Sequence, residues 1–336
     1  MNPFFRVLLF PFSMLYDLVT RFRNHLYDIG YKKSFRFQTM VVSVGNLSMG
    51  GNGKTPMVEY LIRLLKSEYR IAVISRGYGR SSSGFITASS IHTASDIGDE
   101  PLQLFRKFTP DIKVAVGESR ALAIPKMLLK NPEINLIILD DAFQHRMVDP
   151  QTQVLVTDYH NPFFKDHVFP SGMLRESRKN ISRADVVVVT KCPPDISSEQ
   201  RIWFEAQIKK YYELPVFFST IQYQQPCSFS TGEVLVEFPP VLLVTGIAKP
   251  DPLVKYVSNR YQLLEHLQFK DHHNYSRKEI EQIKDRFYGF TAESPILLTT
   301  EKDMVRLISH QKLLADLPIF YMPIESVFIE DEDRFN

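Results

Sequence analysis

The segment from Met40 to Pro56 contains the residues best suited to bind a phosphate group. An apolar run, Met40–Val44, is followed by a glycine-rich turn and then by Lys54 and Thr55. In a strand–loop–helix unit of this kind, backbone N–H groups surround phosphate oxygens, the lysine reaches the β- and γ-phosphates, and the hydroxyl binds Mg²⁺. The usual motif has a glycine at the position where this chain has Ser48. We therefore predict a nucleoside triphosphate site formed by Ser48, Met49, Gly50, Gly51, Asn52, Gly53, Lys54 and Thr55.

A second candidate is the acidic pair Asp140-Asp141, which directly follows the apolar run Leu136–Leu139. A carboxylate at the end of a buried strand can bind the Mg²⁺ of a nucleotide. Adjacent negative charges repel each other unless a cation or hydrogen-bond donors compensate them. A helix N-cap or a solvated turn is the ordinary alternative. The pair Asp99-Glu100 is less specific, because acidic residues are also common where helices begin.

Two more candidates follow apolar runs, and ligands of parallel sheets bind beyond the carboxyl ends of the strands. Arg76 comes directly before Gly77, which favours contact with a phosphate or an acidic substrate; a solvated arginine is the alternative. His272 lies in the string Asp271-His272-His273, where a surface histidine is the alternative. Both residues belong to the predicted ligand-binding edge.

The pattern of apolar runs predicts an α/β fold. The runs are continuous rather than alternating, which is typical of a parallel sheet covered on both faces. Between them lie amphipathic stretches that would form crossover helices. The predicted strands are Met40–Val44, Tyr69–Ser75, Ile112–Val116, Leu136–Leu139, Thr152–Thr157 and Val186–Thr190. The predicted helices include Met57–Lys66, Leu102–Phe108 and Arg120–Leu129. We expect a P-loop NTPase-like sheet with helices on both faces.

The segment Val216–Phe238 has a different pattern, with polar residues between aromatic ones. Its centre, from Ser228 to Glu233, contains Thr231-Gly232 and is typical of a hairpin turn. We interpret it as a two-stranded linker to a smaller α/β domain. That domain would contain strands at Val241–Val244 and Ile296–Thr299 and a helix at Arg277–Tyr288. The predicted parts are an N-terminal helical region (residues 1–36), a P-loop domain (37–215), a β-hairpin linker (216–240), a smaller C-terminal α/β domain (241–327) and an acidic tail (328–336).

The first 36 residues carry six Lys or Arg residues against two acids. The uncharged run from Val7 to Tyr16 is shorter than the roughly 20 residues that span a bilayer. After Pro11, one helical face collects five apolar residues, which suits a helix lying on an anionic membrane surface. Packing of this face against the protein's own domain is the alternative. The five residues are Leu15, Leu18, Val19, Phe22 and Leu26.

Composition and cysteine spacing argue against several classes of protein. The formal net charge is +2, so no overall charge favours nucleic acid. Cys192 and Cys227 lack metal-ligand spacing, which argues against a metal-delivery protein. A GTPase-like switch is another alternative, but Lys191 to Asp195 lacks the aspartate at the spacing that guanine recognition requires. A soluble small-molecule kinase is a third alternative, and it would not explain the amphipathic N-terminus.

Ten sequence blocks together resemble one family. They run in order from about residue 41 to residue 303: VGNLSMGGNGKTP, SRGYGR, GDEP, VGESR, LDDAFQH, FPSGMLRE, VVTKCP, VTGIAKP, FKDHHNY and TEKD. This order resembles the bacterial tetraacyldisaccharide 4′-kinases, the lipid A 4′-kinases of lipopolysaccharide synthesis. The family is similar at Ser48, where it commonly carries Thr or Ser. One departure is Ala142, where the family would have Gly.

The resemblance implies an ATP- and Mg²⁺-dependent lipid kinase. Such an enzyme transfers the γ-phosphate to the 4′-hydroxyl of an acylated glucosamine disaccharide 1-phosphate, forming lipid IVA. The implied place is the cytoplasmic face of the bacterial inner membrane, with the N-terminal helix in peripheral contact with it. The resemblance implies no nucleic acid and no protein partner.

The resemblance also implies roles for residues. Asp99 would be the base, with His272 as its partner. The sequence does not decide whether Asp99, His272 or another carboxylate is the base. Only geometry can separate the role of His272 from that of its neighbour His273. Hinge closure about the linker would bring this pair together. Lys54 would contact the β- and γ-phosphates. The groups around Mg²⁺ would be Thr55, Asp140, Asp141 and Glu100. The substrate contacts would be Arg76, Arg120, His145, Arg175 and Glu176.

Overall fold

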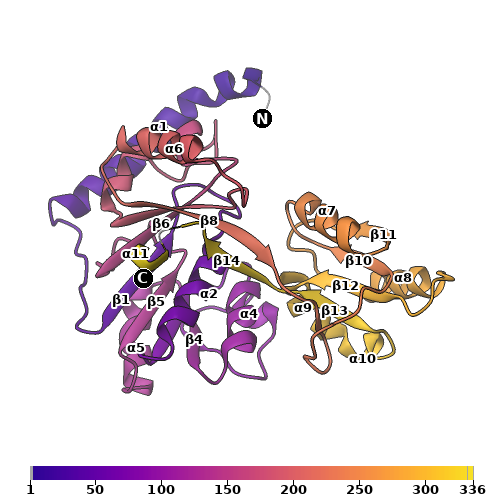
Figure 1. Cartoon of the computed structure of the whole chain (residues 1–336). Coiled ribbons are helices and arrows are strands. Elements are labelled where there is room, and N and C mark those ends of the chain that lie inside the picture. Colours follow the sequence, from indigo (N-terminus) through magenta and orange to yellow (C-terminus); the bar gives the residue numbers. More distant parts are fainter. Residues whose placement is uncertain (1–2, 331, 336) are drawn as a thin grey trace.

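The computed structural model describes residues 3–330 and 332–335, which form a nine-stranded and a five-stranded sheet (Figure 1). Residues 1–2 of the predicted N-terminal region and residues 331 and 336 of the predicted tail lie outside the described residues. The nine-stranded sheet has the order β14-β8-β7-β6-β1-β5-β2-β4-β3. Its strands are β1 (Met40–Gly45), β2 (Ile71–Ser75), β3 (Ile86–Thr87), β4 (Ile112–Val116), β5 (Leu136–Asp140), β6 (Thr152–Asp158), β7 (Val186–Thr190), β8 (Val216–Tyr223) and β14 (Ile324–Phe328).

The six predicted strands are all present, with their ends shifted by at most two residues, and they pair in parallel. The antiparallel pairs of this sheet are β3–β4 and β14–β8. Along β1, Val42 and Val44 pack on one face of the sheet, whereas Val41 packs on the other. Burial on both faces explains why the apolar runs are continuous rather than alternating. The predicted α/β class is confirmed.

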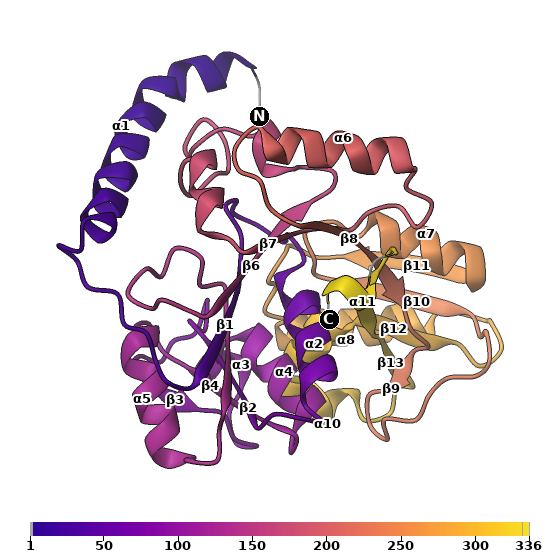
Figure 2. The same ribbon diagram turned by 60° about the vertical axis from the view of Figure 1, so that its left-hand side comes forward.

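Helices cover both faces of this sheet (Figures 1 and 2). The helices α2 and α4 contribute to the core on one face, and α5 contributes to the core on the other. The prediction placed the start of α2 three residues too late, because the helix begins inside the phosphate loop itself. The helices are α1 (Pro3–Asp28), α2 (Lys54–Leu65), α3 (Ala94–Ile97), α4 (Asp99–Phe108), α5 (Arg120–Lys130), the 3₁₀ helices η1 (Phe163–Lys165) and η2 (Arg178–Arg183), and α6 (Ser198–Lys209).

The five-stranded sheet has the order β11-β10-β12-β13-β9 and is parallel except for β13–β9. The strands and the helix predicted for the smaller domain are present. The strands are β9 (Cys227–Ser228), β10 (Val241–Thr245), β11 (Leu263–Gln268), β12 (Ile296–Thr300) and β13 (Ile319–Met322). The helices that follow α6 are α7 (Asp251–Arg260), α8 (Arg277–Tyr288), α9 (Glu301–Leu307), the 3₁₀ helix η3 (Ile308–His310), α10 (Gln311–Leu314) and α11 (Glu332–Phe335).

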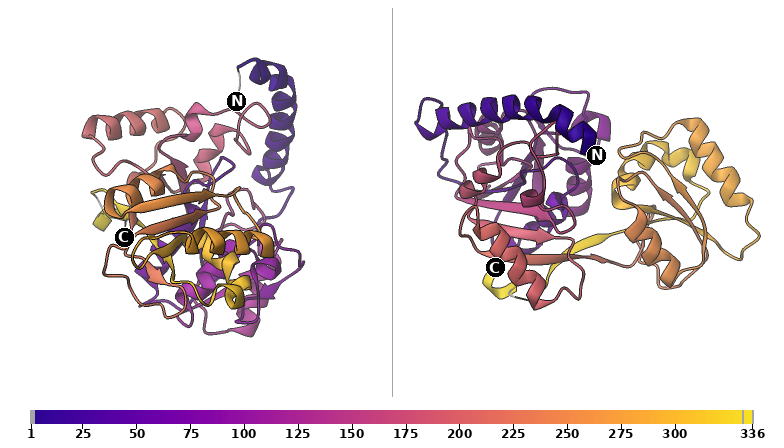
Figure 3. Two further views of the ribbon diagram at one scale, coloured as in Figure 1. Left: turned by 90° about the vertical axis from the view of Figure 1, so that its right-hand side faces the viewer. Right: turned by 90° about the horizontal axis from the view of Figure 1, so that it is seen from above.

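The two sheets are joined by a ribbon of two strands, but the pairing differs from the expected hairpin. The partner of β8 is β14, which returns antiparallel from the far end of the chain (Figure 3). The expected turn does form, with the Ser228 N–H donating to the Glu233 carbonyl oxygen at 2.7 Å, but it follows β9, which pairs with β13 at the edge of the smaller sheet. A strand partner about 100 residues away leaves no local signal in the sequence.

The acidic tail is in part a packed structure. Phe328 lies in β14, and the ring of Phe335 lies 4.4 Å from that of Phe328. Aromatic packing therefore holds the end of the chain against the nine-stranded sheet. The acidic residues Glu330, Glu332 and Asp333 are exposed.

Helix α1 lies along the outside of the P-loop domain (Figure 3). Polar side chains of the helix dock it there. Ser13 Oγ accepts a hydrogen bond from the Ser171 N–H at 2.8 Å, Tyr16 donates to the Arg175 carbonyl oxygen at 3.1 Å, and Asn24 donates to Glu176 at 2.8 Å. Four of the five residues of the predicted apolar face point outward, with exposed fractions near 60% at Leu15 (62%), Leu18 (64%), Val19 (59%) and Phe22 (63%), whereas Leu26 is half-buried. No helix in the described part of the chain combines the length and apolar character needed to cross a bilayer.

The contact between β1 and the turn after β5 generates a prediction at Gly45. A Cβ on Gly45 would lie 2.6 Å from Phe143 Cβ and 2.7 Å from the Phe143 nitrogen. We expect Gly45→Ala to destabilise the protein by about 2 kcal/mol through overpacking, and so to lower the Tm by roughly 4–8 °C. Thermal unfolding measures this. The control is Gly51→Ala, because a Cβ on Gly51 would meet nothing within 4 Å. Equal Tm values for the two variants would contradict the expectation.

Candidate active site

The phosphate loop joins β1 to α2 at the carboxyl edge of the nine-stranded sheet. Gly50 and Gly53 have φ values of 97° and 81°, which L side chains rarely adopt. A Cβ on Gly53 would also lie 3.0 Å from the Thr190 side chain, so the loop passes β7 closely. Thr190 Oγ1 donates to the Asn52 carbonyl oxygen at 2.8 Å. Strand β7 therefore supports the curved shape of the loop.

The FPSGMLRE segment supports the loop from the other side. Ser48 pairs with Leu174 in an isolated bridge, and the Met49 N–H donates to the Met173 carbonyl oxygen at 2.7 Å. These two loop residues were predicted to contact phosphate. In this structure the N–H groups of Met49 and Asn52 are already bonded within the protein, the latter to the Gly50 carbonyl oxygen at 3.1 Å.

Asp141 is neutralised by two cations. Arg175 donates to both of its oxygens, at 2.9 and 3.1 Å, and Lys54 Nζ lies 3.7 Å from Oδ1. Burial would raise the pKa of Asp141, but the charges of Lys54 and Arg175 outweigh burial and lower it. Lys54 also donates to the Gly50 carbonyl oxygen at 3.5 Å. Its ammonium group is therefore directed at the inside of the phosphate loop.

Asp140 is in the opposite situation. It stands opposite Val44 across the β1–β5 pair and is only 1% exposed. Its Oδ1 makes no hydrogen bond among residues 3–330 and 332–335. Burial, followed by the charges of Glu100 and Asp141, raises the pKa of Asp140 to about 7. A buried carboxylate without a partner fits a bound cation, and Glu100 lies close enough to influence it.

The structure brings Asp99 and His272 together across the two domains. His272 Nδ1 lies 2.9 Å from Asp99 Oδ2. Arg306, from α9, donates through Nε to Asp99 Oδ1 at 2.9 Å and through Nη2 to Oδ2. Burial would raise the pKa of Asp99, but the hydrogen bonds from His272 and Arg306 outweigh it, so this pKa lies below its ordinary value. Asp99 is therefore ionised and held by two donors from the smaller domain.

The two adjacent histidines have different surroundings. Lys302 Nζ lies 3.0 Å from His272 Nε2, and Arg306 Nη2 lies 2.8 Å from His272 Nδ1, so each ring nitrogen of His272 faces a cationic group of α9. His273 instead contacts Glu279 at 2.9 Å and stacks on Phe269. Geometry thus separates the pair: His272 faces the acidic site, and His273 packs within the smaller domain.

Arg120 and His145 support the acidic turn from within. Arg120 is 3% exposed, and its Nη2 donates to the carbonyl oxygens of Asp140 and Asp141. Burial lowers the pKa of Arg120 to about 10, so the side chain stays charged at neutral pH. His145 Nε2 accepts from the Arg120 N–H at 3.0 Å, and burial with nearby arginines lowers its pKa to about 4. Both residues were predicted to contact substrate. In this structure the Arg120 guanidinium is bonded to the acidic turn, and His145 is bonded to the Arg120 N–H.

Glu176 was also predicted to meet substrate, but it is 2% exposed and bonded on all sides. It accepts hydrogen bonds from Gln144 at 2.9 Å, Asn24 at 2.8 Å and Asn180 at 2.7 Å, and it forms an ion pair with Arg183. These donors come from three different parts of the chain, since Asn180 and Arg183 both lie in η2. Glu176 therefore joins α1 to the acidic turn.

Arg76 is different, because its side chain is exposed and makes no hydrogen bond or ion pair among residues 3–330 and 332–335. Its charge nevertheless acts on Arg120 and His145, which places it near the acidic turn. Of the predicted substrate contacts, Arg76 is the one whose charged group is left available to a ligand.

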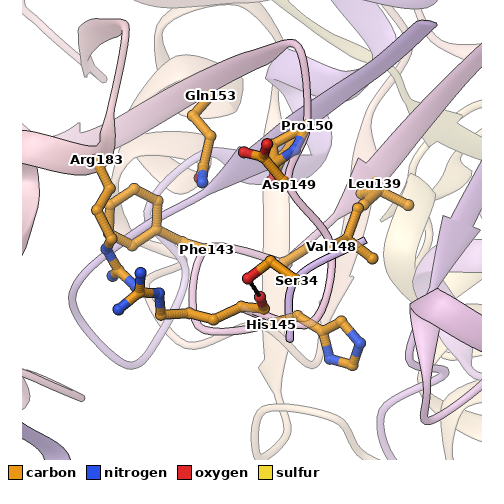
Figure 4. A pocket seen from close by; sticks show the side chains of 12 residues that line it. Ser34, Leu139, Phe143, His145, Val148, Asp149, Pro150, Gln153 and Arg183 are labelled. Carbon is orange, nitrogen blue, oxygen red and sulfur yellow. Dashed lines mark hydrogen bonds between the residues drawn. The ribbon is translucent and has the colours of Figure 1, made fainter. Parts of the chain in front are cut away.

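A cavity of about 230 Å³ lies behind the acidic turn (Figure 4). Three polar atoms that line it, Ser43 Oγ, Gln153 Oε1 and Arg183 Nη1, lack hydrogen-bond partners within the described residues. Ordered water can satisfy such groups, and the volume is sufficient for several molecules. Neither the phosphate loop nor Asp140 lines this cavity, so it is separate from the nucleotide site.

Comparison with known proteins places these features in one family. A family model described as tetraacyldisaccharide-1-P 4′-kinase (LpxK) matches residues 5–336. The chain belongs to this family. It is therefore a tetraacyldisaccharide 4′-kinase, the ATP-dependent enzyme of lipid A biosynthesis that the ordered motifs predict. The switch and metal-delivery alternatives are thereby excluded.

Individual family members cover almost the whole chain. The tetraacyldisaccharide 4′-kinase of Flavobacterium johnsoniae is 42% identical, over 98% of this chain and 95% of its own length. That of Bacteroides thetaiotaomicron is 41% identical, over 98% and 90%. A crystal structure of LpxK from Aquifex aeolicus in complex with ATP is 30% identical with a TM-score of 0.76, and it covers 98% of this chain and 97% of its own.

Sequence reasoning about this kinase missed two residues of the site, Lys302 and Arg306. Both follow β12 in α9, one turn apart, and so lie on the same face of the helix. The signal was available, because TEKD had been singled out and basic residues after a strand belong to the ligand-binding edge. Their partners, however, lie about 30 and 200 residues earlier in the chain.

The contacts of Glu176 generate a prediction about its role in this kinase. We expect Glu176→Ala to cost about 3–5 kcal/mol, because it leaves the Arg183 charge buried without its partner, and so to lower the Tm by at least 6 °C or so. The additional change Arg183→Met should recover part of this loss. Glu205→Ala, at an exposed position of α6, is the control. An unchanged Tm combined with a raised KM for the lipid would show direct substrate contact instead.

Proposed function

We propose that this kinase transfers the γ-phosphate of ATP to the 4′-hydroxyl of an acylated glucosamine disaccharide 1-phosphate, forming lipid IVA. The observation that carries this proposal is the meeting of three groups at one sheet edge: the phosphate loop, the Asp140-Asp141 pair and the Asp99–His272 contact. Phosphoryl transfer needs positioned phosphates, neutralised charge and a group that accepts the hydroxyl proton. These three groups match those needs.

In this proposal the N-terminus of α2 receives the β- and γ-phosphates. The N–H groups of its first turn have no partners within the helix and favour negative charge. Lys54 lies at the start of this turn, between the Gly50 carbonyl oxygen and Asp141, and would exchange these weak contacts for phosphate oxygens. Arg76 at the mouth of the site would meet an anionic group of the acceptor lipid.

The residues present fit Mg²⁺. The buried Oδ1 of Asp140 lacks a partner among the described residues, and oxygen is the ligand type that this ion prefers. Asp140 and Thr55 would hold the ion, with Asp141 and Glu100 close to it. When bound, Mg²⁺ would neutralise charge on the phosphate oxygens. Arg120 and Arg175 keep the two carboxylates in place, whichever ligand is bound.

The chain's own residues would handle the proton. The 4′-oxygen forms a bond to the γ-phosphorus, and the bond from that phosphorus to the β,γ-bridging oxygen breaks, with its electron pair left on ADP. The hydroxyl proton passes to Asp99, which is ionised in this structure. His272 Nδ1 contacts Oδ2 of Asp99 and so helps to orient the carboxylate. The smaller domain thereby contributes to a site whose phosphate loop belongs to the larger one.

We further propose that the enzyme works at the surface of a membrane, at the cytoplasmic face of the bacterial inner membrane. Support comes from the inverted docking of α1, whose polar side bonds to the P-loop domain while its apolar side is exposed. An exposed apolar face of this size is typical of a membrane contact. The exposed cations Lys32 and Lys33 after the helix suit anionic lipids.

Transfer of labelled phosphate tests the activity. With labelled γ-phosphate on ATP and a detergent-solubilised acylated disaccharide 1-phosphate, label should appear in the lipid. Lys54→Ala and Asp99→Ala should each lower kcat by about 100-fold or more, since positioning and proton acceptance each contribute factors of this order. His273→Ala, next to the proposed base partner, is the control and should retain most of the activity. Nucleotide hydrolysis without labelled lipid would refute the proposed reaction.

Vesicle flotation tests the membrane contact. We expect Phe22→Glu to weaken binding to phosphatidylglycerol vesicles by about tenfold, because one large apolar side chain contributes roughly 1.5 kcal/mol or more when it leaves water. The matched control is Ile202→Glu on α6, since Phe22 and Ile202 are both 63% exposed. Phe22→Glu should keep its activity on detergent-solubilised substrate. Equal flotation of the two variants would argue for a kinase without a membrane role.

A further inference from the structure

We infer that Arg306 is a positioning residue that fixes the Asp99 carboxylate so that its Oδ1 is open to the acceptor hydroxyl. The inference rests on the proposed role of Asp99 as the proton acceptor. Arg306 lies outside the ten sequence blocks, and its role is read from the contacts of its guanidinium group. These contacts determine which oxygen of Asp99 is available.

The two oxygens of Asp99 are used unequally. Oδ2 is contacted by both Arg306 Nη2 and His272 Nδ1, and these two nitrogens lie 2.8 Å from each other. Oδ1 receives only the Nε–H of Arg306 among the residues that the structure describes. A carboxylate oxygen accepts about two hydrogen bonds. Two nitrogens lie against Oδ2 and only one lies against Oδ1, so Oδ1 is the oxygen with room to accept the hydroxyl proton.

The guanidinium group is itself held in place. Its Nη1 donates to the His273 carbonyl oxygen at 3.0 Å, and the residue is 7% exposed. Helix α9, which carries it, is fixed at its start by the fully buried Asp303, which accepts from the Gly246 N–H at 2.9 Å. Asp99 is thus clamped in a plane by a planar, two-pronged donor that a lysine cannot imitate.

Orientation matters more than basicity in this reaction. The transition state of phosphoryl transfer is loose, so the enzyme contributes mainly by positioning the reacting groups. A cation bonded to the base weakens it as a proton acceptor, which would be a poor arrangement if basicity limited the rate. The same cation is useful if it holds the accepting oxygen in line with the hydroxyl group.

A simple tie between the domains is the other explanation, and the structure offers a matched control. Lys107 of α4 also reaches across the domains, with Nζ 2.7 Å from Glu301 Oε1, but it does not touch Asp99. If Arg306 only joined the domains, Arg306→Met and Lys107→Met would have similar effects on the rate.

The experiment measures kcat and KM in the labelled-phosphate assay, at a temperature below the Tm of every variant. Arg306→Met should lower kcat by about 100-fold with KM values for ATP and lipid changed by less than about threefold, as expected for a loss in positioning. Arg306→Lys should recover about tenfold, since it restores the charge but not the two-pronged contact. Lys107→Met should change kcat by less than about fivefold. In the Asp99→Asn background, Arg306→Met should have almost no further effect.

The inference is wrong if Arg306→Met behaves like Lys107→Met, or if its loss multiplies with that of Asp99→Asn. Should Arg306→Met fail to fold, Arg306→Lys and the Asp99→Asn/Arg306→Met double variant decide the question, because neither leaves Asp99 as a buried charge without a partner. An active Asp99→Asn enzyme would overturn the proposed role of Asp99 and this inference with it. An inactive Asp99→Asn enzyme beside a fully active Arg306→Met enzyme would overturn only the inference.

Discussion

The crowding of negative charge at one edge of a parallel sheet is the constraint on which the site depends. Asp99, Glu100, Asp140 and Asp141 lie near one another because β1 and β5 end together and α4 begins beside them. Like charges this close are tolerated only with cations or donors between them. The chain supplies these from separate places, the phosphate loop, the FPSGMLRE segment and α9. Among residues 3–330 and 332–335, neither Asp140 nor Glu100 receives a donor, and the buried one, Asp140, is the one suited to a metal ion.

The relative placement of the two domains follows from the same charges. Helix α4 faces α9 at both of its ends, with Asp99 bonded to Arg306 at its start and Lys107 bonded to Glu301 near its end. Lys107 also contacts Glu59 of α2, the helix that begins at the phosphate loop, at 2.7 Å. Burial and the charge of Glu59 raise the pKa of Glu301 to about 7, so this contact involves desolvated groups rather than a surface pair. Two contacts along one helix restrain rotation of the smaller domain more than either would alone.

Patterns that act over a few residues could be predicted from the sequence, and pairings that join distant segments could not. The continuous apolar runs gave the parallel strands, and the glycines with Lys54 gave the loop, because backbone geometry there depends on neighbouring residues. The partner of β8, more than 100 residues away, and the contact of Arg306 with Asp99 depend on the final packing. The predicted substrate residues Arg120 and Glu176 have the expected residue types, but only burial reveals that their charges are used internally. The division into domains and the contacts with substrate stay predictions.

The inverted docking of α1 connects the outer surface of the enzyme to the acidic turn. An amphipathic helix normally docks by burying its apolar face. Helix α1 instead buries Asn24, so hydrogen bonds rather than apolar burial must stabilise its docking. Asn24 bonds to Glu176, Glu176 accepts from Gln144, and Gln144 in turn accepts from Arg175, which holds Asp141. Each of these groups is at least partly buried, and a buried polar group left without its partner costs about 1–3 kcal/mol. The helix cannot tilt away without breaking this chain of contacts. Its exposed apolar face and the carboxylates of the active site are therefore fixed relative to each other.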